Sequence, residues 1–147
     1  MTVEAARVTI EEFNRLAQDG SGFLDIYDFV AEEICCGSAR MRLRYQDYHV
    51  RAGGTMAGPS IMALADFAVY AALMGTVGPI QMAVTSSLSI NFLRRPVAAD
   101  MIGEARIVKT TKRLAFGEVD LFTVGEEVPI AHVTSTYAIP KAVTASS

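Results

Sequence analysis

The sequence predicts an α+β domain, in which an antiparallel sheet of five to six strands wraps around one long helix. Two observations support this fold class: one apolar segment of helical length, and several segments with the alternation and turn residues of strands. The length of 147 residues suits one domain, and a hydrophobic share of 51% is enough for a core. We therefore expect a single domain over residues 1–147, with a frayed tail over 141–147.

The elements are expected in a simple order. Thr9-Ile10-Glu11-Glu12 is a capping box, so a short helix should run from about Ile10 to Gln18 and stop at the polar segment 19–22. Two strands should follow, at 28–36 and 38–45. The loop through His49 leads to the long helix, which ends within 75–79. The remaining strands are expected at 82–94, 101–111, 113–124 and, after a turn at 125–127, at 128–139.

The long helix is expected to begin at Gly58 and Pro59, with Gly58 as its N-cap, because proline in the first turn lacks only an N–H that would have no partner there. Six apolar residues have the helical spacing to pack against the sheet: Ile61, Leu64, Ala65, Ala68, Ala72 and Leu73. The pattern therefore predicts a buried central helix.

Asp66 is the only charged residue between Ile61 and Met74. An ionised carboxylate on a helix that is apolar on all sides is unfavourable unless it is paired, hydrated or used in chemistry. Two interpretations therefore stand side by side: a structural carboxylate satisfied by a local hydroxyl or water, and a general base.

The other end of the helix suggests a second functional group. Free N–H groups at a helix N-terminus, with the positive end of the helix dipole, can bind an anion or polarise a carbonyl oxygen. An ordinary loop-to-helix junction is the alternative. Gly58 and Asp66 lie roughly 12 Å apart along the helix, so one carbonyl cannot contact both within one subunit. The catalytic interpretation therefore predicts a symmetric dimer with composite sites.

These residues carry a family resemblance. Gly54-Thr55-Met56-Ala57-Gly58-Pro59, followed by Leu64-Ala65-Asp66-Phe67-Ala68, resembles the motif G-T-L-H-G-G and L-A-D-x-A of the hotdog-fold PaaI-type acyl-CoA thioesterases. Segments 83–94, 113–119 and 131–137 resemble the family's later strands, so the resemblance covers about residues 25–140. It implies the hotdog fold and a dimer seam or acyl pocket lined by residues that do not face the sheet, such as Tyr70 and Met74.

The resemblance also implies roles for individual residues. The Gly58 N–H would polarise the thioester carbonyl, Asp66 from the facing subunit would act as general base or nucleophile, and Thr85 would hold the attacking water. The sequence departs from the motif at three positions: Ala57 replaces a histidine, Pro59 replaces a glycine, and Arg51 replaces an asparagine that helps orient the substrate. His49 is either a packed histidine or a substitute for the missing one.

Several basic residues are candidate contacts for the phosphates of coenzyme A: Arg94, Arg95, Lys112 and Arg113. A solvated face is the alternative explanation for each of them. Arg40, Arg42 and Arg44 alternate with apolar residues, as expected for one basic face of a half-buried strand. Coenzyme A would be part of the substrate, and no separate cofactor is expected.

The sequence gives little support to other classes of function. A net charge of −3 argues against nucleic-acid binding, and the sequence has no uninterrupted apolar run of membrane-spanning length. No signal peptide is visible, so we expect a cytoplasmic protein that does not bind a membrane. Cys35 and Cys36 are adjacent and are read as free thiols on opposite faces of a strand, while His49 and His132 alone cannot form a metal site. A nucleophile elbow and a phosphate-binding P-loop are also absent.

The sequence thus favours hydrolysis of an acyl-CoA thioester by a homodimer, which could pair into a dimer of dimers. The first alternative is a hotdog protein that binds acyl-CoA or acyl groups without catalysis, as the changes at Ala57 and Arg51 would allow. A dehydratase-like hotdog enzyme is the second alternative, and the absence of the motif histidine counts against it.

Overall fold

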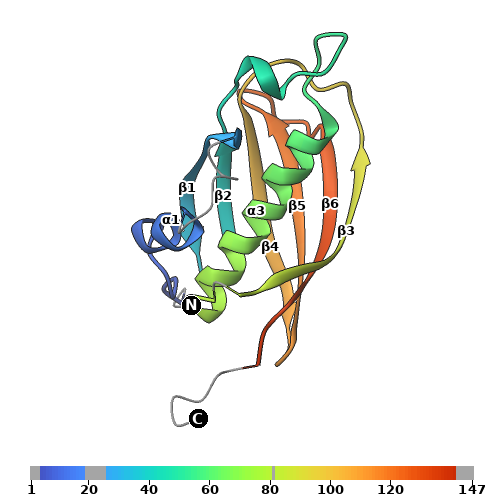
Figure 1. The fold of residues 1–147 in the computed structure, drawn as a ribbon. Helices are drawn as coiled ribbons and strands as arrows, with labels where there is room; N and C mark the ends of the chain where they lie inside the picture. The colour runs from blue at the N-terminus through green and yellow to red at the C-terminus, as the bar shows by residue number, and fades with distance from the viewer. Residues whose placement is uncertain (1–3, 19–25, 81, 142–147) are drawn as a thin grey trace.

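A computed structural model of the chain describes residues 4–18, 26–80 and 82–141. One long helix, α3 (Gly58–Val77), lies across one face of a six-stranded antiparallel sheet, and a short helix, α1 (Ile10–Gln18), lies beside the first strand (Figure 1). A single turn of 3₁₀-helix, η1 (Asp47–His49), precedes the loop that enters α3. This is the α+β hotdog arrangement that the sequence predicts.

All neighbouring strands of the sheet are antiparallel, in the order β1-β2-β4-β5-β6-β3. The strands are β1 (Phe29–Cys35), β2 (Ser38–Leu43), β3 (Val84–Phe92), β4 (Met101–Thr110), β5 (Leu114–Thr123) and β6 (Ala131–Ala138). Each expected strand exists, and its ends lie within three residues of the expected ones. The expected stop of α1 at 19–22 and most of the expected tail lie outside the described residues.

The apolar face predicted for α3 is the centre of the core. Its six predicted residues are all fully buried against the sheet. Three of the six are alanines, whose small side chains allow the sheet to approach the helix closely. Among the described residues, α3 is the one helix with the length and composition of a membrane span, and 61% of its most apolar window is buried within the fold.

The last turns of α3 are enclosed by the turn between β1 and β2. The Gly37 N–H donates a hydrogen bond to Thr76 Oγ1 at 2.9 Å, and Gly75 lies directly against the carbonyl group of Cys35. Met74, in the same part of the helix, is fully buried, so the prediction that it would line a seam or pocket is wrong. Tyr70, one turn earlier, remains partly exposed, as predicted for a residue that does not face the sheet.

Candidate functional site

The loop before α3 forms a hollow around the helix N-terminus. Gly53 and Gly54 turn this loop with φ angles of 102° and 82°, which favour glycine. The Met56 N–H donates to the carbonyl of Pro96 at 3.2 Å, which ties the loop to the chain beyond β3. The hollow has a volume of about 210 Å³ and is lined by Arg51, Thr55, Met56, Gly58, Phe92 and Pro96. We call this group the glycine half-site.

Gly58 presents an N–H in this half-site. The helix begins at Gly58 with Ala57 as N-cap, one residue earlier than predicted, and Ala57 has no side chain that could cap the helix. The N–H groups of Ser60 and Ile61 both donate to the Ala57 carbonyl, whereas that of Gly58 donates to no described residue. At the positive end of the helix dipole, such a donor can polarise a carbonyl oxygen.

Asp66 lies in a second group, which we call the carboxylate half-site: Asp66, Thr85 and Tyr137. Asp66 Oδ1 accepts hydrogen bonds from Thr85 Oγ1 at 2.6 Å and from the Tyr137 hydroxyl at 2.9 Å. The Tyr137 hydroxyl also lies 3.0 Å from the main-chain carbonyl oxygen of Asp66. The family resemblance points to Asp66 and Thr85. Tyr137, which is 71 residues from Asp66 along the chain, is not among the predicted site residues.

The buried phenol is held in its protonated form. Burial, and next the negative charge of Asp66, raise the pKa of Tyr137 far above its ordinary value. Tyr137 is therefore a hydrogen-bond donor to Asp66 at neutral pH.

A single chain keeps the two half-sites apart. A Cβ atom on Gly58 would lie 3.4 Å from Phe92 Cζ, so the glycine half-site is next to the end of β3, whereas Asp66 bonds to Thr85 near the beginning of β3. With eight residues of helix between them, Gly58 and Asp66 are roughly 12 Å apart along the axis.

The histidines lie elsewhere. His49 is 1% exposed, its Nε2 is 2.7 Å from the Ile26 carbonyl oxygen, and its ring stacks on Tyr27. A ring so enclosed cannot reach a bound substrate without movement of its loop, so this geometry favours the packed interpretation of His49. His132 lies in β6 and bonds to the Asp120 carboxylate at 2.8 Å, with Glu118 3.3 Å from its other ring nitrogen.

The four candidate phosphate ligands form two separate pairs. Arg94 and Arg95 are exposed just beyond the end of β3. Lys112 and Arg113 are exposed in the turn between β4 and β5, near the beginning of β3, because Leu114 pairs with Ala138 and Ala138 with Val84. The pairs are therefore separated by roughly seven residues of strand, or about 23 Å.

A hollow of about 240 Å³ adjoins the second pair. Its walls are apolar and its rim carries three cations, the lining residues being Val77, Ile80, Lys112, Arg113, Ile139, Pro140 and Lys141. Apolar walls with cations at the rim could accommodate a nucleotide base and its phosphates.

Both arginines of β2 are paired with carboxylates, whereas Arg44 lies just beyond the strand. Arg40 and Arg42 bind Glu32, and Arg42 also binds Asp100. Hydrogen bonds from Arg42 and Arg40 lower the pKa of Glu32. These two arginines therefore form part of a charged network on the sheet and are not unpaired cations.

Cys35 ends β1, whereas Cys36 lies in the turn, so the prediction of one strand holding both is wrong for Cys36. Both thiols are free. Hydrogen bonds to Glu33 and Glu4 raise the pKa of Cys35 and Cys36, respectively, which disfavours the reactive thiolates. No cluster of ligands for a metal ion occurs within the described part of the chain.

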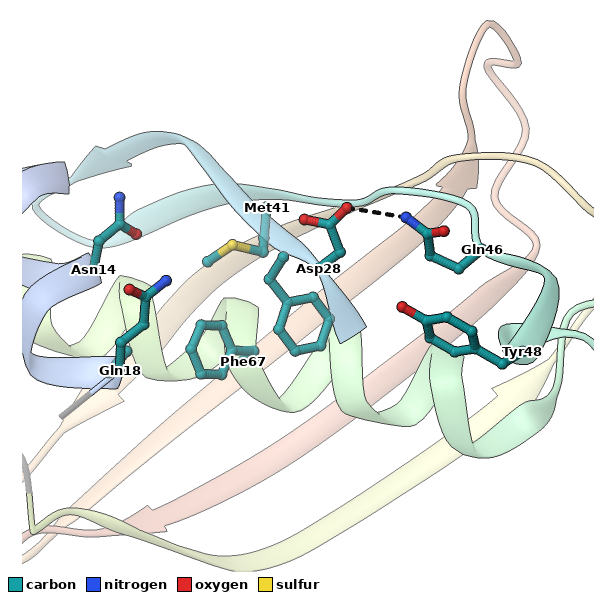
Figure 2. A pocket seen from close by; sticks show the side chains of 9 residues that line it. Asn14, Gln18, Asp28, Met41, Gln46, Tyr48 and Phe67 are labelled. Atoms are coloured by element: carbon teal, nitrogen blue, oxygen red, sulfur yellow. Dashed lines mark hydrogen bonds between the residues drawn. The ribbon is translucent and has the colours of Figure 1, made fainter. Parts of the chain in front are cut away.

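A further hollow of about 240 Å³ lies between α1, β1 and α3 (Figure 2). Its floor includes Phe67, whose ring stacks on Phe29 at 4.9 Å, while Asp28 and Gln46 share a hydrogen bond of 3.2 Å at the rim. Phe67 follows Asp66 in the sequence, yet Phe67 contacts β1 at one edge of the sheet, while Asp66 contacts β3 and β6 at the opposite edge. This hollow is therefore separate from the carboxylate half-site.

Comparisons with known proteins support the hotdog fold. The model of the thioesterase superfamily matches residues 53–130, which include Gly58, Asp66 and Thr85. The crystal structure of a candidate thioesterase from Silicibacter sp. TM1040 is 34% identical, with a TM-score of 0.79 and coverage of 95% of each chain. A candidate esterase from Sulfurisphaera tokodaii is 26% identical over 82% of this chain and 90% of its own length. A variant of the phenylacetic acid degradation protein PaaI from Thermus thermophilus shares the fold, at 24% identity, a TM-score of 0.71, and coverage of 82% and 100%.

Proposed function

This chain belongs to the thioesterase superfamily, and from that premise we propose that it hydrolyses an acyl-CoA thioester to a free acid and coenzyme A. The observation that carries the proposal is the carboxylate half-site, in which a helix that is otherwise apolar presents Asp66 with two hydroxyl donors on one oxygen. A carboxylate held in place by two donors can serve as a general base or as a nucleophile.

The reaction needs few groups. Asp66 removes a proton from water as the water oxygen attacks the thioester carbonyl, or attacks that carbon itself to form an anhydride that water then cleaves. The Gly58 N–H stabilises the negative charge that develops on the carbonyl oxygen. The thiolate of coenzyme A leaves and takes up a proton. Thr85 can hold the water, because its hydroxyl oxygen still has lone pairs when it donates to Asp66.

We further propose that two copies of the chain form each site. β3 is an edge strand of the sheet, and Val84 and Phe92 at its ends are 57% and 47% exposed. Antiparallel pairing of β3 with its own copy about a two-fold axis at Leu88 would place Val84 opposite Phe92. Since Phe92 is next to Gly58 and Thr85 next to Asp66, this pairing brings the glycine half-site of one chain to the carboxylate half-site of the other.

The same pairing would bring Lys112 and Arg113 of one chain toward Arg94 and Arg95 of the other. The four cations would then surround one nucleotide, which a single chain does not allow. In this arrangement Arg51 lines the acyl side of the site, where it would replace the usual asparagine. Assembly of two dimers into a tetramer is compatible with this site.

The direct experiment is an assay of thiol release over a panel of acyl-CoA substrates with short, long and aromatic acyl groups. Hydrolysis of at least one of them supports the proposal. Tight binding of acyl-CoA with no thiol release on any substrate would instead identify a non-catalytic binding protein, which the Ala57 and Arg51 departures favour as the second candidate.

The composite site can be tested by mixing two inactive variants. Gly58→Pro removes the N–H at a helix position that tolerates proline, and Asp66→Asn removes the base. Random pairing of the two chains gives half hybrids with one intact site each, so about a quarter of wild-type activity should return after mixing by unfolding and refolding.

Gly58→Ala is the matched control for this experiment, because it keeps the N–H and its Cβ makes only an ordinary contact with Phe92. It should remain active alone. A wild-type protein that hydrolyses thioesters as a monomer at the assay concentration would exclude the composite site.

Replacing both Lys112 and Arg113 by Ala should raise KM for acyl-CoA about tenfold with little change in kcat, because charge-assisted contacts to the phosphates act equally in ground and transition states. The effect should fade at high salt. The measurement is kcat and KM with acyl-CoA and with an acyl-pantetheine, which lacks the nucleotide. A change with acyl-CoA alone indicates phosphate binding rather than support of the turn.

Lys109→Ala is the control, since Lys109 is exposed on β4 and does not line the hollow beside Arg113. Equal damage to hydrolysis of both substrates by the double substitution would mean that Lys112 and Arg113 support the turn and do not bind phosphate.

A further inference from the structure

The two oxygens of Asp66 have different surroundings. Oδ1 accepts from Thr85 at 2.6 Å and from Tyr137 at 2.9 Å, while no described residue donates a hydrogen bond to Oδ2. The donors come from β3 and β6, neighbouring strands of the same sheet. The carboxylate is thus fixed at one oxygen by two strands, and its other oxygen is left for a ligand.

The chemistry of these donors suits a carboxylate that must remain reactive. Both donors are neutral hydroxyls, so they hold the carboxylate without placing a positive charge beside it. Asp66 forms no ion pair with any described residue. The titratable side chain that faces it directly is Tyr137 on β6, and Tyr70 on α3 stacks on Tyr137 at 6.0 Å.

Tyr137 is well suited to hold a fixed position. Its side chain is 3% exposed, and its ring is packed on Tyr70. Thr85 is exposed on the edge strand and is held less firmly by its surroundings. The rigid member of the pair is therefore Tyr137.

We propose that Tyr137 is a positioning residue for the thioester hydrolysis proposed above: together with Thr85 it occupies Oδ1 of Asp66, so that Oδ2 alone acts on water or on the thioester. In the general-base form, Oδ2 takes a proton from water, the water oxygen bonds to the carbonyl carbon, and the carbon–sulfur bond breaks as the thiolate leaves. This inference rests on the proposed function. Its NMR test does not depend on activity, so the inference and the proposed function can fail independently.

Tyr137→Phe keeps the ring and removes the donor. We expect kcat to fall about tenfold with KM nearly unchanged, since one hydrogen bond to a charged group is lost. The acidic limb of the pH–rate profile should move up, because a carboxylate with one donor fewer takes up a proton more readily. Tyr45→Phe is the matched control: its hydroxyl donates to the Asp47 carboxylate at 3.0 Å, outside both half-sites, and its loss should change neither quantity.

Thr85→Val provides a second variant that does not disturb the core, because Thr85 is exposed. It should also move the acidic limb upward, and Thr85→Ser should restore the wild-type profile. A Thr85→Val variant with lower kcat but an unmoved acidic limb would show that Thr85 only holds water, and the shared occupation of Oδ1 would be overturned.

Titration of the Asp66 carboxyl carbon by NMR makes the test independent of activity. The midpoint should rise in Tyr137→Phe and stay in place in Tyr45→Phe, even if no acyl-CoA of the panel is hydrolysed and the proposed function fails. An unchanged midpoint together with wild-type kcat in a folded Tyr137→Phe protein would mean that Tyr137 only packs against Tyr70, and would overturn the inference.

Discussion

Asp66→Asn should lower kcat about a thousandfold or more on any acyl-CoA that the wild type hydrolyses, while the fold remains intact. The amide oxygen can still accept the hydrogen bonds of Thr85 and Tyr137, but the amide nitrogen at the place of Oδ2 can neither remove a proton nor attack a carbonyl. The measurement is kcat by thiol release, with thermal unfolding at the same protein concentration to verify the fold.

A carboxylate outside both half-sites supplies the control. Asp47→Asn alters an exposed acid in η1, away from both half-sites, and should leave kcat unchanged. If Asp66→Asn retained wild-type kcat but lost stability, Asp66 would be a structural group and the proposed mechanism would be wrong.

Gly75→Ala should destabilise the protein by about 3 kcal/mol or more, because overpacking against backbone cannot be relieved by a side-chain movement. A Cβ atom at this position would collide with the carbonyl oxygen of Cys35 and lie 2.9 Å from Ile34 Cγ2. Alanine would gain about 1 kcal/mol of helix propensity over glycine, too little to offset the collision. Chemical denaturation at a fixed protein concentration gives the difference in unfolding free energy.

Gly58→Ala is the matched substitution in the same helix, because the nearest side chain to its Cβ would be Phe92 at 3.4 Å. It should change stability little. If Gly75→Ala were as stable as Gly58→Ala, the contact between α3 and the β1–β2 turn would be looser than the structure shows.

The sequence predicts the elements well because their signals are local. The capping box at Thr9 is formed as expected, with the Glu12 N–H donating to Thr9 Oγ1 at 3.1 Å. The buried face of α3 follows directly from helical spacing. The strand ends are less accurate, because partners elsewhere in the sheet determine where each ladder of hydrogen bonds stops.

The candidate site is predicted only in part, because its geometry depends on distant strands. The pattern singles out Asp66 by its charge and Gly58 by its place before Pro59. No local sequence signal identifies Tyr137 as a site residue. It lies in β6, where buried and exposed residues alternate as in an ordinary strand. The prediction for Met74 is wrong for the same reason, because helical spacing alone does not reveal which side chains the rest of the fold covers.

The edge position of β3 also affects how the chain behaves before it assembles into a dimer. An edge strand presents a row of main-chain donors and acceptors that any extended segment can pair with, and here Val84 and Phe92 add apolar surface. Crowded, half-folded chains could therefore aggregate along β3 during rapid expression. Slow synthesis at low temperature should favour soluble protein. A charged residue introduced on β3 would increase solubility but weaken assembly of the dimer.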